Sequence, residues 1–123
     1  MNPNNYASLE ASNRLVKAGI VLETEALWVK WYFDTSTNMN YSPFEWRLMY
    51  RSLTQVDLEY IPAPSMAEVW RELLDITISI RLQKDGLYFL FLADDTFESY
   101  RDNPTDALID LLIWVRKEDG HEG

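Results

Sequence analysis

The sequence predicts an α+β domain in which three helices cover mainly one face of an antiparallel sheet of four to five strands. Three stretches carry apolar residues at helical spacing, and four to five others alternate apolar and polar residues with the period of a strand. The strands follow one another across local turns, which favours antiparallel pairing. The predicted order is α-β-β-α-β-β-(β)-α in one domain over residues 1–123, with residues 1–7 and 118–123 flexible.

The first and last helices each have a recognisable end. The first is expected over residues 8–18, where Gly19 can adopt the left-handed conformation that ends helices. The last is expected after Asn103, a good N-cap residue, with Pro104 at the first helical position, where a missing N–H costs nothing. Residues 107–115 are apolar almost all round, so this helix should be deeply covered.

The central helix is expected over residues 65–74. Ser65 and Glu68 have the spacing of a capping box, in which each side chain accepts a hydrogen bond from the other residue's backbone amide. One face of this helix is apolar and consists of Met66, Val69, Trp70, Leu73 and Leu74. We therefore predict that this face packs on the sheet and that Trp70 is buried.

Two stretches predict a first hairpin. Residues 26–33 alternate, with Leu27, Val29, Trp31 and Phe33 on the side expected to be buried, and residues 44–52 alternate as well. The polar residues 34–43 form the long loop between them. Residues 57–61 should also be extended, because a residue that precedes proline avoids helical torsions.

A second hairpin is predicted with a tighter turn. Residues 76–83 alternate, residues 87–92 are apolar on both sides, and the Asp85-Gly86 pair between them suits a turn with positive φ. Residues 97–101 add a short edge strand.

Composition narrows the function classes. The formal net charge is −9, which repels phosphates, so we expect no double-stranded nucleic acid partner. No stretch approaches the roughly 18 apolar residues of a membrane span, and the polar start lacks the features of a signal peptide, so we expect no membrane partner and a cytoplasmic location. An acidic surface can attract a basic protein partner, although most acidic domains are simply well solvated.

No catalytic residues are predicted. The chain has no cysteine, and its one histidine, His121, lies in a stretch expected to fray, which argues against thiolate chemistry, a Ser-His-Asp triad and a zinc site. Its four glycines form no phosphate-binding loop. The enzyme class therefore ranks below binding functions, and we expect no cofactor.

Carboxylates gather in one segment, at Asp94, Asp95, Glu98, Asp102, Asp106 and Asp110. Oxygen ligands of this kind suit Mg²⁺ or Ca²⁺, but the spacing does not match a calcium loop. A carboxylate in the first turn of a helix, such as Asp106, is already explained by the helix dipole. We predict no metal site here.

The outward face of the first hairpin is the candidate binding site. If the strands pair as expected, aromatic and basic side chains share this face, namely Trp28, Lys30, Tyr32, Arg47 and Arg51. Aromatic rings can stack on bases, and guanidinium groups bind phosphates or carboxylates, so the face could bind a nucleotide, a short single strand or an acidic protein patch. The alternative is that a helix or a second subunit covers Trp28 and Tyr32 while the arginines are solvated.

Three blocks carry a resemblance to a known family. They are the segments Ala11-Ser12-Asn13-Arg14-Leu15-Val16-Lys17-Ala18-Gly19-Ile20, Ile61-Pro62-Ala63-Pro64-Ser65-Met66-Ala67-Glu68-Val69-Trp70-Arg71-Glu72-Leu73 and Pro104-Thr105-Asp106-Ala107-Leu108-Ile109. Together they resemble a family of small uncharacterised proteins of bacteria and their phages. Each block is a helix with its preceding residues, so the resemblance implies a fold and a mobile-element context rather than a chemistry.

Two function classes stay open. The first is a non-enzymatic, acidic interaction protein, phage or mobile-element encoded as the resemblance implies, that binds and modulates a host protein. A homodimer through the first hairpin is the simplest form of such an interaction. The second class is a small-ligand domain that binds or sequesters a nucleotide-like molecule between sheet and helix.

Overall fold

The protein folds into three helices and two three-stranded antiparallel sheets. The computed structural model describes residues 2–32, 44–54 and 58–121. The helices are α1 (Leu9–Lys17), α2 (Met66–Arg71) and α3 (Pro104–His121), with short 3₁₀ turns η1 (Pro3–Asn5) and η2 (Arg51–Leu53). The strands are β1 (Ala26–Tyr32), β2 (Phe44–Tyr50), β3 (Tyr60–Pro62), β4 (Ile78–Leu82), β5 (Tyr88–Leu92) and β6 (Glu98–Arg101).

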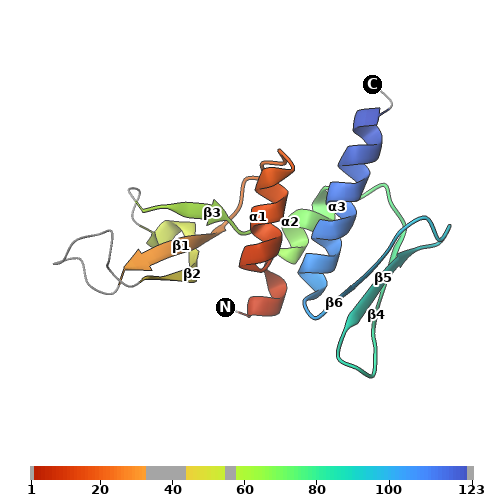
Figure 1. Ribbon diagram of the computed structural model, residues 1–123, viewed down its shortest axis with the longest axis horizontal. Helices are drawn as coiled ribbons and strands as arrows, with labels where there is room; N and C mark the ends of the chain where they lie inside the picture. Colours follow the sequence, from red (N-terminus) through yellow and green to blue (C-terminus); the bar gives the residue numbers. More distant parts are fainter. Residues whose placement is uncertain (1, 33–43, 55–57, 122–123) are drawn as a thin grey trace.

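The α+β class is confirmed, but the single sheet of four to five strands is wrong. In Figure 1 the helices stand between a sheet of order β2-β1-β3 and a sheet of order β4-β5-β6. The first sheet stops at β3, because Pro62 and Pro64 lack the N–H group that a ladder needs. The chain then passes through α2 before the second sheet begins.

The first sheet is built around β1. β2 pairs with it antiparallel from Ala26↔Tyr50 to Tyr32↔Phe44, and β3 pairs with its other edge from Leu27↔Pro62 to Val29↔Tyr60. Pro62 is tolerated because β3 is an edge strand. The predicted hairpin and the extended segment before Pro62 are thus both present. Of the side predicted to be buried, Leu27 and Val29 are buried and Trp31 is half-buried, whereas Phe33 lies outside the described residues.

The second sheet begins with the predicted tight hairpin. The Gln83 amide donates to the Leu87 carbonyl at 2.9 Å, and the Gly86 amide donates to the Gln83 carbonyl at 3.0 Å. Gly86 has φ +86°, as its place after Asp85 predicts. The predicted edge strand forms as β6 and completes the sheet.

Gly86→Ala should lower the free energy of unfolding by about 1 kcal/mol, since a Cβ atom disfavours positive φ. Apart from Gly86 and its two chain neighbours, no described residue has a heavy atom within 4 Å of the added Cβ position, so the cost is conformational rather than a clash with other residues. Gly86→Asn is the matched control, because asparagine enters the left-handed region more readily. Chemical denaturation of both variants measures the difference, and equal stability of Gly86→Ala and wild type would contradict this account of the turn.

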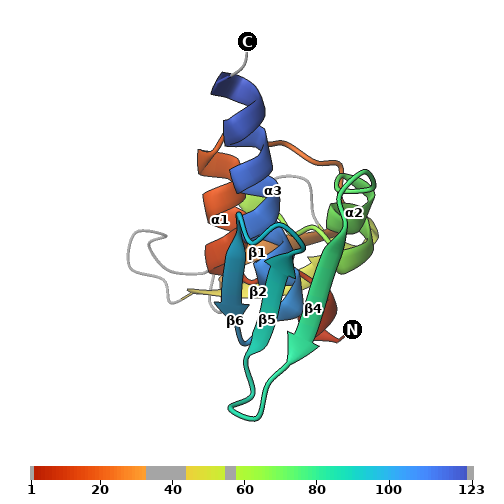
Figure 2. The same cartoon turned by 90° about the vertical axis from the view of Figure 1, so that its right-hand side faces the viewer.

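The main hydrophobic core surrounds α3. Among the described residues of this helix, five aliphatic side chains are fully buried: Ala107, Leu108, Ile109, Leu111 and Leu112. They pack with buried residues of α1, of the α2 segment and of β5. Figure 2 shows β5 and β6 in front of the lower part of α3. The prediction of a deeply covered last helix is confirmed for the apolar residues between 107 and 112, whereas Ile113, Trp114 and Val115 are half-buried.

The start of α3 holds the amino-terminal segment in place. Asn103 caps the helix by accepting from the Thr105 amide at 2.8 Å, and its side-chain amide donates to the Tyr6 carbonyl at 2.9 Å. The Thr105 hydroxyl donates to the Asn4 carbonyl at 2.8 Å. Tyr6 and Ala7 are buried, so this part of the segment expected to be flexible is packed. At the other end, α3 extends to His121, beyond the point where fraying was expected, and residues 122–123 lie outside the described residues.

The capping box at the start of α2 forms as predicted, but the buried face of the helix differs. The Ser65 amide donates to Glu68 at 2.8 Å and the Glu68 amide donates to the Ser65 hydroxyl at 3.1 Å. The regular helix ends at Arg71, earlier than expected. Val69 and Leu73 are buried, whereas Trp70 is 42% exposed, so its predicted burial is wrong. Val69 and Leu73 thus pack in the core, whereas Trp70 and Leu74, on the adjacent side of the segment, stay exposed.

Candidate functional site

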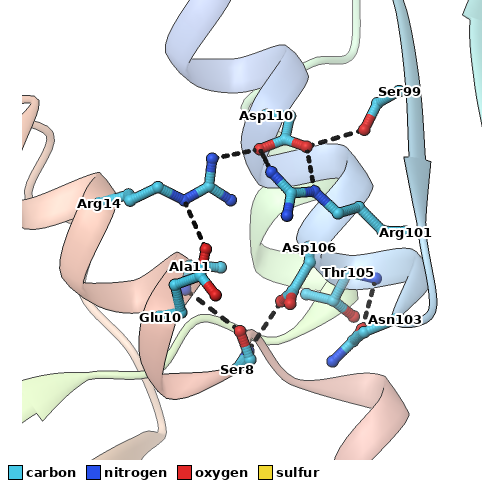
Figure 3. Close-up of polar contacts among 10 residues, drawn as sticks. All are labelled: Ser8, Glu10, Ala11, Arg14, Ser99, Arg101, Asn103, Thr105, Asp106 and Asp110. Carbon is cyan, nitrogen blue, oxygen red and sulfur yellow. Dashed lines mark hydrogen bonds and ion pairs between the residues drawn. The ribbon is translucent and has the colours of Figure 1, made fainter.

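The densest group of charged contacts joins α1, β6 and α3 around Asp110 (Figure 3). Asp110 accepts from the Ser99 hydroxyl and from Arg101 Nε, each at 2.7 Å, and lies 2.7 Å from Arg14 Nη1. Its side chain is 12% exposed, and the two arginine side chains are about one third exposed, at 34% and 35%. With three donors on one carboxylate, Asp110 is a structural junction rather than a free base.

Two neighbouring carboxylates on α3 have pKa values shifted in opposite directions. Burial opposes the ionisation of Asp110, but hydrogen bonds from Arg101, Ser99 and Arg14 outweigh it and lower the pKa of Asp110. Asp106 accepts from the Ser8 amide at 2.8 Å, yet burial dominates and raises the pKa of Asp106. The charge of Asp110 therefore stabilises the fold, whereas the charge of Asp106 opposes folding. As the pH falls, the contributions of the two groups to the free energy of unfolding change in opposite directions.

The other carboxylates of the segment 94–110 do not converge on these two. Asp94 accepts from the Thr96 amide and hydroxyl, in a local turn. Among residues 2–32, 44–54 and 58–121, no three side chains of the types that ligate metals lie close enough to hold one ion.

An open apolar groove lies between the amino-terminal segment, α2 and β4. Its volume is about 920 Å³, and its lining comprises Asn5, Tyr6, Ser65, Met66, Ala67, Trp70, Arg71, Leu74 and Ile80. Trp70 is 42% exposed and Leu74 is 72% exposed, which is unusual for large apolar side chains that lie side by side. The groove is thus a hydrophobic surface without a partner among the described residues.

The groove runs beside a free sheet edge. Gln83 and Leu87 form a hydrogen-bonded pair that continues the β4–β5 ladder. Because such pairs alternate with non-hydrogen-bonded pairs, Ser79 and Arg81 direct their backbone groups toward β5. The amides and carbonyls of the intervening residues Ile78, Ile80 and Leu82 therefore point away from β5. β4 is the last strand on that side of the sheet, and none of the described strands pairs with this edge.

The five residues predicted to share the outward face of the first hairpin do not share one face. The register places Trp28 opposite Leu48, Lys30 opposite Trp46 and Tyr32 opposite Phe44. Arg47 lies opposite Val29 and therefore on the other side, and Arg51 lies beyond β2 in η2. In this register, even-numbered residues of β1 lie on the same face as even-numbered residues of β2. The prediction that Trp28 and Tyr32 share a face with the two arginines is therefore wrong.

Each of these side chains has a contact within the chain. Trp28 Nε1 donates to the Ala7 carbonyl at 2.9 Å, and Lys30 Nζ lies 3.6 Å from Glu59 and 4.3 Å from the centre of the Phe44 ring. The Tyr32 and Phe44 rings pack at 6.0 Å. Arg47 contacts Glu45 and the Trp31 ring, and Arg51 Nε donates to the Thr24 carbonyl at 3.0 Å. Whether this sheet binds a partner stays a prediction.

Sequence reasoning placed a ligand site between sheet and helix as an alternative but did not identify the residues of this groove, although a signal for them existed. Met66, Trp70 and Leu74 recur every four residues and form a stripe of their own beside Val69 and Leu73. One apolar stripe is enough to pack a helix against a core. The second stripe is therefore the feature of the sequence that indicates an exposed apolar surface.

Comparison with known proteins gave no match to a family model, a curated protein or a solved structure. The resemblance based on the three helical blocks therefore stays a prediction. In the part of the chain that the structure describes, no helix has the length and apolar character needed to cross a membrane.

Proposed function

We propose that this chain is a cytoplasmic, non-enzymatic interaction protein that binds an extended apolar segment of another protein in the groove beside β4. The free edge of β4 next to the exposed Trp70 and Leu74 supports this proposal. Under the family resemblance, the protein would be encoded by a phage or mobile element and its partner would be a host protein whose activity the binding modulates.

Strand addition to β4 accounts for both features together. An extended segment that pairs with β4 satisfies the outward-pointing amides and carbonyls of Ile78, Ile80 and Leu82. Every second side chain of that segment then points into the groove, where Trp70 and Leu74 contribute apolar area. Backbone pairing supplies affinity, and the groove selects alternating apolar residues. The net charge of −9 favours a segment flanked by basic residues.

The groove is less well suited to a nucleotide-like ligand. A nucleotide needs several convergent polar or cationic groups, and among the described residues that line this groove only Arg71 is charged. Trp70 could stack on a base, so the small-ligand class is kept as an outcome of the test.

Leu74→Glu should abolish capture of the partner, because a carboxylate in the groove would lose its hydration against an apolar segment. Leu53→Glu is the matched control, since Leu53 is 71% exposed and Leu74 is 72% exposed, and Leu53 does not line the groove. Affinity capture from host lysate, quantified by mass spectrometry, should recover the same partner with wild type and Leu53→Glu. The interaction is then repeated with the purified partner.

Two variants at Ile80 separate backbone pairing from side-chain contact. Both Ile80→Ala and Ile80→Pro remove the isoleucine side chain, but only proline also removes the outward amide, and edge strands tolerate proline there. Binding of the purified partner should be weaker for Ile80→Pro than for Ile80→Ala. Equal capture by all variants would refute the groove as the site, and a rise in melting temperature with a nucleotide would favour the small-ligand class.

A further inference from the structure

The outer face of the second sheet is a second surface, separate from the groove. On the inner face, Ser99 and Arg101 contact Asp110 of α3. Because side chains alternate along a strand, the register places six residues on the opposite, outer face: Ser79, Arg81, Phe89, Phe91, Glu98 and Tyr100. We call these six residues the aromatic face. In Figure 2 no other described element lies in front of these strands.

Three rings of the aromatic face form a pre-arranged group. The Phe89 and Phe91 rings stack at 4.9 Å with an angle of 23° between their planes, and Phe89 and Tyr100 stack at 4.7 Å with an angle of 15°. Tyr100 is 49% exposed, while both phenylalanines are half-buried. Because the rings already pack against one another, a partner would meet an ordered apolar surface and lose little side-chain entropy on binding. Aromatic clusters of this kind are typical of protein interfaces.

The charges on this face point to a second copy of the same chain. Arg81 pairs in register with Phe89 from the β4 side, and Glu98 pairs with Phe91 from the β6 side, so the two charges occupy opposite corners around the rings. Both side chains are exposed, and neither forms a salt bridge with a described residue. A two-fold axis between two facing sheets can exchange these corners. Each Arg81 then lies over the partner's Glu98, with rings against rings between them.

We infer that the protein forms a symmetric homodimer through the aromatic face, held by the stacked rings and by two Arg81–Glu98 ion pairs between the copies. Among its six residues this face carries one positive and one negative charge, whereas the whole chain carries −9. Two such chains repel each other over most of their surface, so a neutral, apolar face is where they can meet. Single-stranded nucleic acid is the less favoured occupant, because the face offers one cation to a row of phosphates.

The dimer leaves the proposed function intact and adds to it. The groove lies on the helix side of β4, and the aromatic face lies on the opposite side of the same sheet. A dimer would therefore present two grooves, and a partner that engaged both would bind more tightly by avidity. Partner binding in the groove and dimerisation through the aromatic face are measured by different experiments, so one proposal can be refuted while the other holds.

Charge reversal tests the dimer. Arg81→Glu and Glu98→Arg each place like charges together in both pairs, so each variant alone should have a dimer dissociation constant about a hundredfold higher than wild type. Mixing the two variants pairs opposite charges again and should restore dimers as heterodimers. The double variant Arg81→Glu/Glu98→Arg should also dimerise. Sedimentation velocity over a concentration series measures the masses, and circular dichroism checks that each variant is folded.

Three outcomes would overturn the inference. One is a wild type that stays monomeric over the whole concentration series. The second is a wild type whose association neither single variant weakens. The third is a pair of weakened variants whose mixture does not associate. A monomeric wild type that binds a single-stranded oligonucleotide through Tyr100 would reassign the face to base stacking.

Discussion

Leu108→Ala should lower the free energy of unfolding by about 3 kcal/mol. Leu108 is fully buried in the core cluster that α3 shares with α1, the α2 segment and β5. Truncation removes three methylene-sized groups from this cluster and leaves a cavity that four elements would have to move to fill. The loss should therefore exceed the transfer free energy of the side chain alone.

Chemical denaturation of Leu108→Ala beside Leu53→Ala measures this effect. Leu53 is 71% exposed, so the same truncation there should change stability by only about 0.5 kcal/mol. A Leu108→Ala variant as stable as Leu53→Ala would mean that α3 does not organise the core. The slope of the unfolding free energy against denaturant concentration should be the same for both variants and wild type, which would show that all three expose the same surface area on unfolding.

The features that the sequence predicts well all depend on neighbours in the chain. The Ser65–Glu68 capping box, the positive φ of Gly86 and the cap at Asn103 each involve residues no more than three positions apart. At such short range the backbone geometry leaves few alternatives. The residue types therefore determine the local structure before tertiary packing acts.

The features that it predicts poorly depend on distant segments. Ten residues, 34–43, stand between the two predicted strands, too many for the sequence to fix the register of the first hairpin. A shift by one residue moves Arg47 from one face of the sheet to the other. The single-sheet prediction failed for a related reason, because β3 pairs back on β1 and nothing local specifies that β4 starts a new sheet.

The candidate surfaces illustrate the same limit. The apolar spacing in α2 predicts an amphipathic helix, but helical periodicity cannot tell which of two adjacent stripes meets the core, and Val69 and Leu73 meet it instead of Trp70. The aromatic face required the register of two strand pairs before Tyr100 could be placed beside Phe89. Likewise, Asp110 meets Arg14 although 95 residues separate them, a contact that no local pattern encodes.

Asp110→Asn should lower the free energy of unfolding at neutral pH by about 2 kcal/mol. The change keeps the shape of the side chain but removes the charge that Arg14 and Arg101 share. Breaking a fully buried pair typically costs about 3–5 kcal/mol. The expected loss is smaller here, because the arginine side chains are 34% and 35% exposed and water can partly replace the carboxylate.

The pH dependence gives this prediction its sharpest test. Because the pKa of Asp110 is lowered below its ordinary value of 3.8, its stabilising effect is fully present above that pH and is lost as the pH falls through the folded-state pKa. The stability gap between wild type and Asp110→Asn should therefore close in acid.

Asp106→Asn is the matched control on the same helix. Burial raises the pKa of Asp106, so its charge opposes folding, and the amide oxygen of asparagine can still accept from the Ser8 amide. That variant should be as stable as wild type or slightly more stable at neutral pH, and its advantage should fade in acid. A gap for Asp110→Asn that does not change between neutral pH and pH 3 would mean that packing, rather than the charge of Asp110, joins α1 and β6 to α3.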